Sequence, residues 1–127
     1  MLKQDEERLN IVVKKLSQLP YVSVIILFGS QATGKQRFDS DIDIAVITKK
    51  ISKNQELELL GYGNEKIEIS LFENLPLMVQ FRVIRDGKML VMKDEKKFHD
   101  IKYKIIKKYL DFSYYMNNFY RSVIKNV

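Results

Sequence analysis

The chain has no cysteine and only one histidine, His99, among its 127 residues. The absence of cysteine excludes disulfides and thiolate metal sites, and it fits a cytoplasmic protein. No apolar run is long enough to cross a membrane, and the residues from Met1 to Glu7 are too acidic and polar for a signal peptide. We therefore expect a cytoplasmic protein with no membrane partner, in which His99 is a solvated side chain rather than a catalytic base.

The positive charge of the chain is concentrated in its last third. The net charge is +6, but residues 1–87 carry 12 basic and 12 acidic side chains and are neutral, whereas residues 88–127 carry 10 basic and 4 acidic side chains. Such a segment attracts nucleic acid or an acidic partner, and it is equally typical of the solvated face of a lysine-rich helix. We favour the solvated helix and expect no nucleic-acid partner.

The spacing of apolar residues predicts helices that alternate with strands. Apolar side chains recur every three or four residues in some segments, and alternate or run continuously in others. Ser52, followed three residues later by Gln55, is typical of a capping box, and Pro20 and Gly87 are expected to end helices. Helices are predicted over residues 3–18, 53–60, 76–87 and from 94 onward, and strands over residues 22–28, 41–48, 66–72 and 88–92. This order predicts an α/β (α+β) fold, with one domain over residues 1–127 and a mixed sheet of three to four strands packed by helices.

The long C-terminal helix carries two apolar stripes. The first is expected to face the core, and it consists of Phe98, Ile101, Ile105, Tyr109, Phe112, Met116, Phe119 and Val123. The second lies on another side of the helix and consists of Tyr103, Ile106, Leu110 and Tyr114. A helix at the edge of a small domain cannot easily bury both stripes against its own fold. The second stripe is therefore either further core or an interface with a partner.

The stretch from Leu27 to Val46 contains the residues with the clearest chemistry. Asp41 and Asp43 are two residues apart at the start of a predicted strand, so they project to the same side. Carboxylates this close repel unless a cation or a proton lies between them, and Mg²⁺ or Mn²⁺ with oxygen ligands is the usual cation. Gly29 allows the backbone to approach a ligand closely, and the amides and hydroxyl that follow at Ser30 can bind phosphate.

Three further residues complete this candidate site. If the strands over residues 41–48 and 66–72 pair, Glu68 stands beside the two aspartates as a third carboxylate. Lys35 and Arg37 in the intervening loop can neutralise a polyphosphate, although both are also ordinary loop charges. A phosphate-binding turn next to paired carboxylates is typical of phosphoryl or nucleotidyl transfer, in which two metal ions clamp the attacking and leaving oxygens.

These residues carry a resemblance to a known family. The arrangement of Gly29-Ser30, ten residues, and then Asp41-Ile42-Asp43 resembles the signature of the DNA polymerase beta nucleotidyltransferase superfamily. In detail it is similar to the minimal nucleotidyltransferases, the antitoxin partners of HEPN ribonuclease toxins in prokaryotes. The strand around Glu68 and the R-V-I-R-D-G-K-M-L-V segment before the long helix also match that layout, so the resemblance covers nearly the whole chain.

The resemblance implies a role for each site residue. Gly29 and Ser30 would bind the triphosphate, Asp41 and Asp43 would bind two Mg²⁺ or Mn²⁺ ions, and Glu68 would be the third metal ligand and the base. The third carboxylate of the family is commonly aspartate, and Glu68 is one methylene longer. Relatives also often carry arginines in the Gly-Ser loop, where this chain has Gln31 and Thr33.

The resemblance also implies a function. The chain would be a metal-dependent nucleotidyltransferase that moves AMP from ATP to a tyrosine of a cognate HEPN toxin, as a type VII-like antitoxin, and its C-terminal helix is the candidate contact with the toxin. Two alternatives stay open at this point. One is an antitoxin that neutralises its toxin by binding alone, and the other is a small-molecule (antibiotic) nucleotidyltransferase completed by dimerisation.

Overall fold

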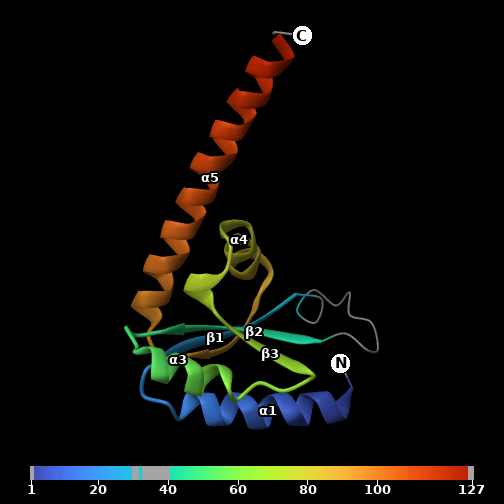
Figure 1. Ribbon diagram of the computed structural model, residues 1–127, viewed down its shortest axis with the longest axis vertical. Helices are drawn as coiled ribbons and strands as arrows, with labels where there is room; N and C mark the ends of the chain where they lie inside the picture. Colours follow the sequence, from blue (N-terminus) through green and yellow to red (C-terminus); the bar gives the residue numbers. More distant parts are fainter. Residues whose placement is uncertain (1, 30–31, 33–40, 126–127) are drawn as a thin grey trace.

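The computed structural model describes residues 2–29, 32 and 41–125, and these residues form a four-stranded sheet with helices on both faces (Figure 1). The helices are α1 (Lys3–Ser17), α3 (Lys53–Leu60), α4 (Leu77–Asp86) and α5 (Glu95–Lys125), with a 3₁₀ turn, η1, at Phe72–Asn74. The strands are β1 (Val22–Phe28), β2 (Ile42–Thr48), β3 (Ile67–Leu71) and β4 (Lys88–Met92).

The predicted elements are confirmed with small changes at their ends. The capping box is present at the start of α3, where Ser52 accepts from the Gln55 amide at 3.2 Å and Gln55 accepts from the Ser52 amide at 2.9 Å. The third strand was predicted to reach Phe72, which instead begins η1. Phe72 is buried among residues of the second core, and this packing explains why the chain turns there.

The sheet has the strand order β3-β2-β1-β4 and is mixed, as predicted. β1 is antiparallel to both β2 and β4, whereas β2 and β3 are parallel. A parallel pair needs a crossover connection, which α3 supplies. In consequence the C-terminal end of β1 lies beside the N-terminal ends of β2 and β3, at one end of the strands.

Each face of the sheet has its own hydrophobic core. α1 and α3 cover one face, and α4 with the first turns of α5 covers the other (Figure 1). Burying an aliphatic side chain contributes ~1.5–3 kcal/mol, so the two cores together supply most of the favourable free energy of folding. The first core includes Leu9, Val12, Leu16, Ile25, Ile44, Leu59 and Ile67, and the second includes Val24, Ile26, Ala45, Ile47, Phe72, Val83 and Ile105.

The helix α5 begins against the sheet and then extends away from the rest of the molecule (Figure 1). Ile105 is buried, and the Tyr109 ring stacks on Phe81 of α4 with ring centroids 3.7 Å apart. Beyond this stack the prediction of a core-facing stripe is wrong, because Phe112 and Phe119 are 45% and 51% exposed. The rest of the described domain ends at that level of the helix, so none of its described residues covers them. Despite its length, neither α5 nor any other helix in the described residues is apolar enough to cross a membrane.

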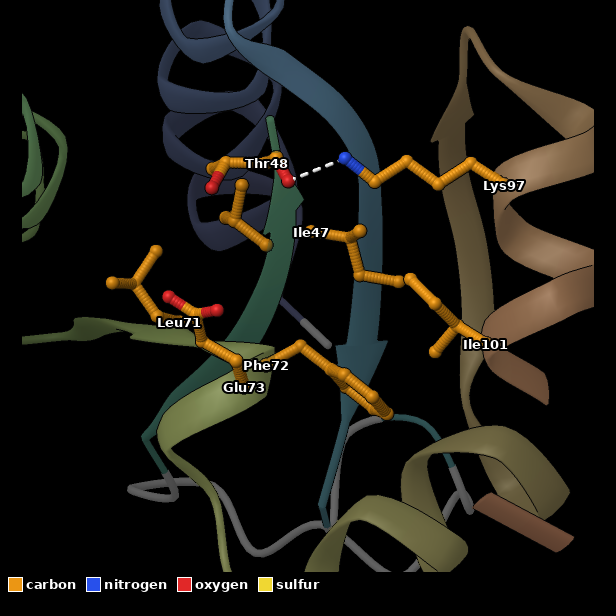
Figure 2. Close-up of a pocket in the computed structure, with 8 residues that line it drawn as sticks. Ile47, Thr48, Leu71, Phe72, Glu73, Lys97 and Ile101 are labelled. Carbon is orange, nitrogen blue, oxygen red and sulfur yellow. Dashed lines mark hydrogen bonds between the residues drawn. The ribbon is translucent and has the colours of Figure 1, made fainter. Parts of the chain in front are cut away.

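A lysine fixes the base of α5 to the sheet. Lys97 donates from Nζ to the carbonyl oxygen of Thr48 at the end of β2, with a distance of 2.6 Å. Figure 2 shows this bond beside a cavity of about 160 Å³, with Ile101 of α5 facing Ile47 and Phe72 across it. This contact lies at the opposite end of β2 from Asp41 and Asp43, so it sets the direction of α5 without touching the candidate site.

The Lys97 contact makes a prediction about α5. Lys97→Met keeps the apolar stem but removes the donor to a half-buried carbonyl, so we expect a loss of ~1–2 kcal/mol in the free energy of unfolding. Amide hydrogen exchange in the first turns of α5 should also become faster. Lys96→Met is the matched control, because Lys96 is exposed and should change stability by less than about 0.5 kcal/mol. Equal effects of the two substitutions would contradict the anchoring role.

Candidate active site

The three predicted acids lie at the edge of the sheet where β1 ends and β2 and β3 begin. Phe28 at the end of β1 is opposite Asp43, and Glu68 of β3 is in register with Asp43. The neighbours of Asp43 and Glu68 along their strands are isoleucines buried in the first core, so both acids project to the other face of the sheet. Asp41 is exposed and directly precedes β2. The pairing that brings Glu68 beside the aspartates is therefore confirmed.

The carboxyl group of Asp43 is held in an unfavourable environment for a charge. Partial burial, the negative charges of Glu68 and Asp41, and a hydrogen bond with Glu68 together raise the pKa of Asp43 from 3.8 to about 6. Burial is the largest of these causes. Near neutral pH the site thus holds carboxylates that repel one another, an arrangement that favours binding of a cation.

Glycine is required where the chain leaves β1. Gly29 has a φ of +76°, which other residues rarely adopt, and a Cβ placed there would lie 2.7 Å from Oδ2 of Asp43. The backbone of Gly29 therefore packs directly against the Asp43 carboxyl group. This contact joins the predicted phosphate-binding turn to the acidic residues, although residues 29 and 43 are well separated in the sequence.

The arrangement suits a divalent metal that is completed by a substrate. Among residues 2–29, 32 and 41–125, no three carboxylate, histidine or cysteine side chains are grouped so that they could hold an ion by themselves. Mg²⁺ typically takes one or two protein carboxylates and fills its octahedron with phosphate oxygens and water. The two oxygens of the half-buried Asp43 and the exposed carboxylates of Asp41 and Glu68 fit that pattern of donors. A role for all three as metal ligands stays a prediction.

Asp41 and Glu68 are exposed to solvent beside β3, which is an edge strand of the sheet. Asp41 and Glu68 line an open depression of about 360 Å³ together with the turn at Gly63, Asn64 and Glu65. Lys66, which precedes β3, has its Nζ 4.0 Å from Oδ2 of the buried Asp5 of α1. The exposed Glu68 is one of the residues that line the depression.

Part of the predicted phosphate site is outside the described residues. This applies to Ser30, Lys35 and Arg37, and to Gln31 and Thr33. The structure also places residues beside Gly29 that sequence reasoning missed. Val79 and Arg82 of α4 line a cavity that Gly29 also lines. Their helical spacing indicated a shared side of α4, but nothing in the sequence indicated which strand end that side would meet.

The chain belongs to the polymerase beta nucleotidyltransferase family, whose sequence pattern matches residues 10–96. The family predicted from the Gly-Ser and Asp-x-Asp residues is thereby confirmed. The matched region runs from within α1 to the beginning of α5 and contains every candidate site residue.

Two curated proteins are similar in sequence. A protein of Methanocaldococcus jannaschii, provisionally named a protein adenylyltransferase, is 36% identical over 66 residues, which are 52% of each chain. The protein adenylyltransferase MntA of Aphanizomenon flos-aquae is 28% identical over 93 residues, which are 61% of this chain and 62% of that protein. The chain thus spans about half to three fifths of the length of these relatives.

Solved structures share the fold over almost the whole chain. One is a toxin–antitoxin crystallised with AMP-PNP, with a TM-score of 0.68, 21% identity, and coverage of 94% of this chain and 98% of that one. Another is the complex of a tri-AMPylated Shewanella oneidensis HEPN toxin with an MNT antitoxin, with a TM-score of 0.65, 19% identity, and coverage of 98% and 99%. These likenesses confirm the predicted nucleotidyltransferase fold with its long C-terminal helix.

The raised pKa of Asp43 predicts how stability depends on pH. The folded protein holds this proton more tightly than the unfolded chain does, so folding loses stability as the pH rises from 3.8 to about 6. Asp43→Asn removes the charge, and above pH 6 we expect the metal-free variant to melt at a higher temperature than the wild type. The difference should shrink as the pH falls toward 4.

Thermal unfolding followed by circular dichroism over this pH range measures the effect. Added Mg²⁺ should raise the melting temperature of the wild type more than that of the variant. Asp111→Asn, an exposed position on α5, is the control and should change neither curve. A variant less stable than the wild type at every pH would show that the Asp43 carboxylate is not under electrostatic strain.

Proposed function

We propose that this protein transfers AMP from ATP to the hydroxyl of a tyrosine on a cognate HEPN toxin and acts in the cytoplasm as an antitoxin. One observation carries the proposal. The carboxyl group of Asp43 lies against the backbone of Gly29, and Asp43 is in register with Glu68, so that Gly29 and these two acids lie together at one end of the strands. Membership in the nucleotidyltransferase family supports the reaction type. The names of the sequence relatives and of the fold neighbours support a protein acceptor.

Each group of site residues has its own role in the proposed reaction. The turn at Gly29 and Ser30 holds the triphosphate and presents its α-phosphorus, with Lys35 and Arg37 contributing positive charge. The acceptor oxygen bonds to that phosphorus, the bond to the outgoing pyrophosphate breaks, and Glu68 takes the hydroxyl proton. Glu68 suits this part because it is exposed to the depression through which an acceptor enters. Asp41 and Asp43 would hold two Mg²⁺ ions, which when bound would neutralise charge on the phosphates.

The acceptor is presented by a partner that docks on α5. Beyond Tyr109 the helix continues for about four turns with exposed aromatic and aliphatic side chains. Tyr103, Leu110 and Tyr114 are 72%, 58% and 71% exposed and lie on one side of it. An apolar stripe of this length is typical of a protein interface. The excess of basic residues after Lys88 favours a partner whose contact surface has an acidic rim.

The catalytic proposal predicts transfer of label from ATP to the toxin. Purified protein mixed with α-labelled ATP, Mg²⁺ and the product of the neighbouring gene should label that product, and a tyrosine should carry the AMP when the product is analysed by mass spectrometry. The double variant Asp41→Ala with Asp43→Ala should lower the rate by at least about 100-fold, because it removes the charge that holds the metals.

Glu68→Gln and Glu68→Asp separate the roles of the third acid. Glu68→Gln cannot accept the proton, so it should lower the rate of AMP transfer, whereas Glu68→Asp should retain most of that rate.

If the double variant Asp41→Ala with Asp43→Ala protects cells as well as the wild type at equal abundance, the protein neutralises its toxin by binding alone. Labelling of an aminoglycoside instead of the toxin would favour the small-molecule alternative.

The docking proposal is tested separately from catalysis. Leu110→Asp with Tyr114→Asp puts charge on the apolar stripe, and we expect the toxin to elute separately from this variant in size-exclusion chromatography. Lys14→Asp, an exposed position on α1 at the other face of the sheet, is the control and should leave the complex intact. ATP binding should be the same in all three proteins. A complex that survives the stripe substitutions, or a homodimer that they alone disrupt, would contradict docking of the toxin at this face.

A further inference from the structure

A second cavity lies directly beside the Gly29 turn. It measures about 230 Å³ and lies between the end of β1 and one side of α4. Its lining consists of Phe28, Gly29, Val79, Arg82, Asp86 and Gly87. Gly29 therefore lines this cavity on one side and contacts the Asp43 carboxyl group on the other. A ligand bound at the Gly29 turn would have acids on one side and this cavity on the other.

The charges around the cavity are unequal. Asp86 is paired with Arg85, whose Nε and Nη2 lie 3.0 and 2.7 Å from its two carboxylate oxygens, and the Arg85 guanidinium also lies 5.6 Å from the centre of the Phe81 ring. Arg82 is one turn earlier on α4 and makes no hydrogen bond or ion pair with any residue in the described part of the chain. Asp86 is thus engaged by Arg85, and Arg82 is the cationic side chain of the cavity lining.

The position of Arg82 on α4 is fixed by its neighbours. Val83 is buried in the second core, and Phe81 stacks on Tyr109 of α5, so both flanking side chains are committed to packing. Val79, Arg82 and Asp86 are spaced by three and four residues and share the remaining side of the helix, which meets the cavity. Gly87 closes this corner, because a Cβ there would collide with the Val83 carbonyl oxygen and with Ile26. The end of α4 is thus pressed tightly onto β1.

We propose that Arg82 binds the β- and γ-phosphates of the nucleotide and stabilises the outgoing pyrophosphate. This inference rests on the proposed nucleotidyl transfer and adds a residue to it. A guanidinium group offers a planar pair of N–H donors that matches phosphate oxygens, and it stays charged throughout the reaction. Negative charge grows on the pyrophosphate as its bond to the α-phosphorus breaks, and a cation beside Gly29 lies where that charge develops. Arg82 thereby supplies positive charge to the Gly29 turn from α4.

Equilibrium binding of three probes tests the role of Arg82. Inorganic tripolyphosphate, ATP and adenosine are titrated in the presence of Mg²⁺ into the wild type and into Arg82→Ala, Arg82→Lys and Arg121→Ala. Arg82→Ala should weaken tripolyphosphate and ATP about 10- to 100-fold, the value of one or two charge-assisted hydrogen bonds, and leave adenosine unchanged. Arg82→Lys should recover part of the loss. Arg121→Ala removes an exposed arginine of α5 and should behave as the wild type.

The outcomes distinguish this inference from the proposed function. If the wild type binds ATP and Arg82→Ala binds tripolyphosphate equally well, Arg82 has no phosphate role, and the transferase proposal stands. If Arg82→Ala weakens adenosine as much as tripolyphosphate, the residue shapes the cavity or contacts the nucleoside, and the phosphate assignment is wrong. A wild type that binds none of the three probes overturns both proposals. Melting temperatures within about 2 °C of the wild type would exclude misfolding of the variants as the cause.

Discussion

Three carboxylates repel one another at the edge of the sheet, and the strand pairing holds them together against that repulsion. Asp43 and Glu68 stand side by side only because β2 and β3 are parallel and in register. The isoleucines that alternate with these acids are buried on the opposite face, and each contributes ~1.5–3 kcal/mol. The first core therefore stabilises a site that lies on the other side of the sheet. Burial of Asp43 and, after it, the negative charges of Glu68 and Asp41 raise the pKa of Asp43, which shows that its charged form is disfavoured at this place.

Much of the fold could be predicted from the sequence because its signals are local. The β-branched run of β1, the alternation in β2 and β3, and the Ser52–Gln55 capping box each report a structure formed by neighbouring residues. The aspartates and Gly29 could be found in the same way, since their spacing along the chain already implies a turn between two strands. The side of the sheet to which Asp43 projects follows from the same alternation.

Features that depend on distant contacts could not be predicted. The end of β3 at Leu71 is set by burial of Phe72 in the second core, and the buried Asp5 of α1 meets Lys66, 61 residues further along the chain, at 4.0 Å. The apolar stripe of α5 continues in the sequence beyond Tyr109, but the domain does not, so only the structure shows where the core ends. Arg82 was missed for a related reason. Its neighbourhood is created by packing of α4 on the end of β1.

Because α5 is attached to the domain only near its N-terminal end, a small rotation there moves its far end by a much larger distance. With a rise of about 1.5 Å per residue the helix is roughly 46 Å long, so a tilt of about 10° at its base displaces its far end by roughly 8 Å. Such a tilt is limited by the Lys97 bond to Thr48, by the Phe81–Tyr109 stack, and by the packing of Phe98, Ile101 and Ile105 in the second core. A molecule held at the tip is therefore positioned by contacts at the opposite end of the helix.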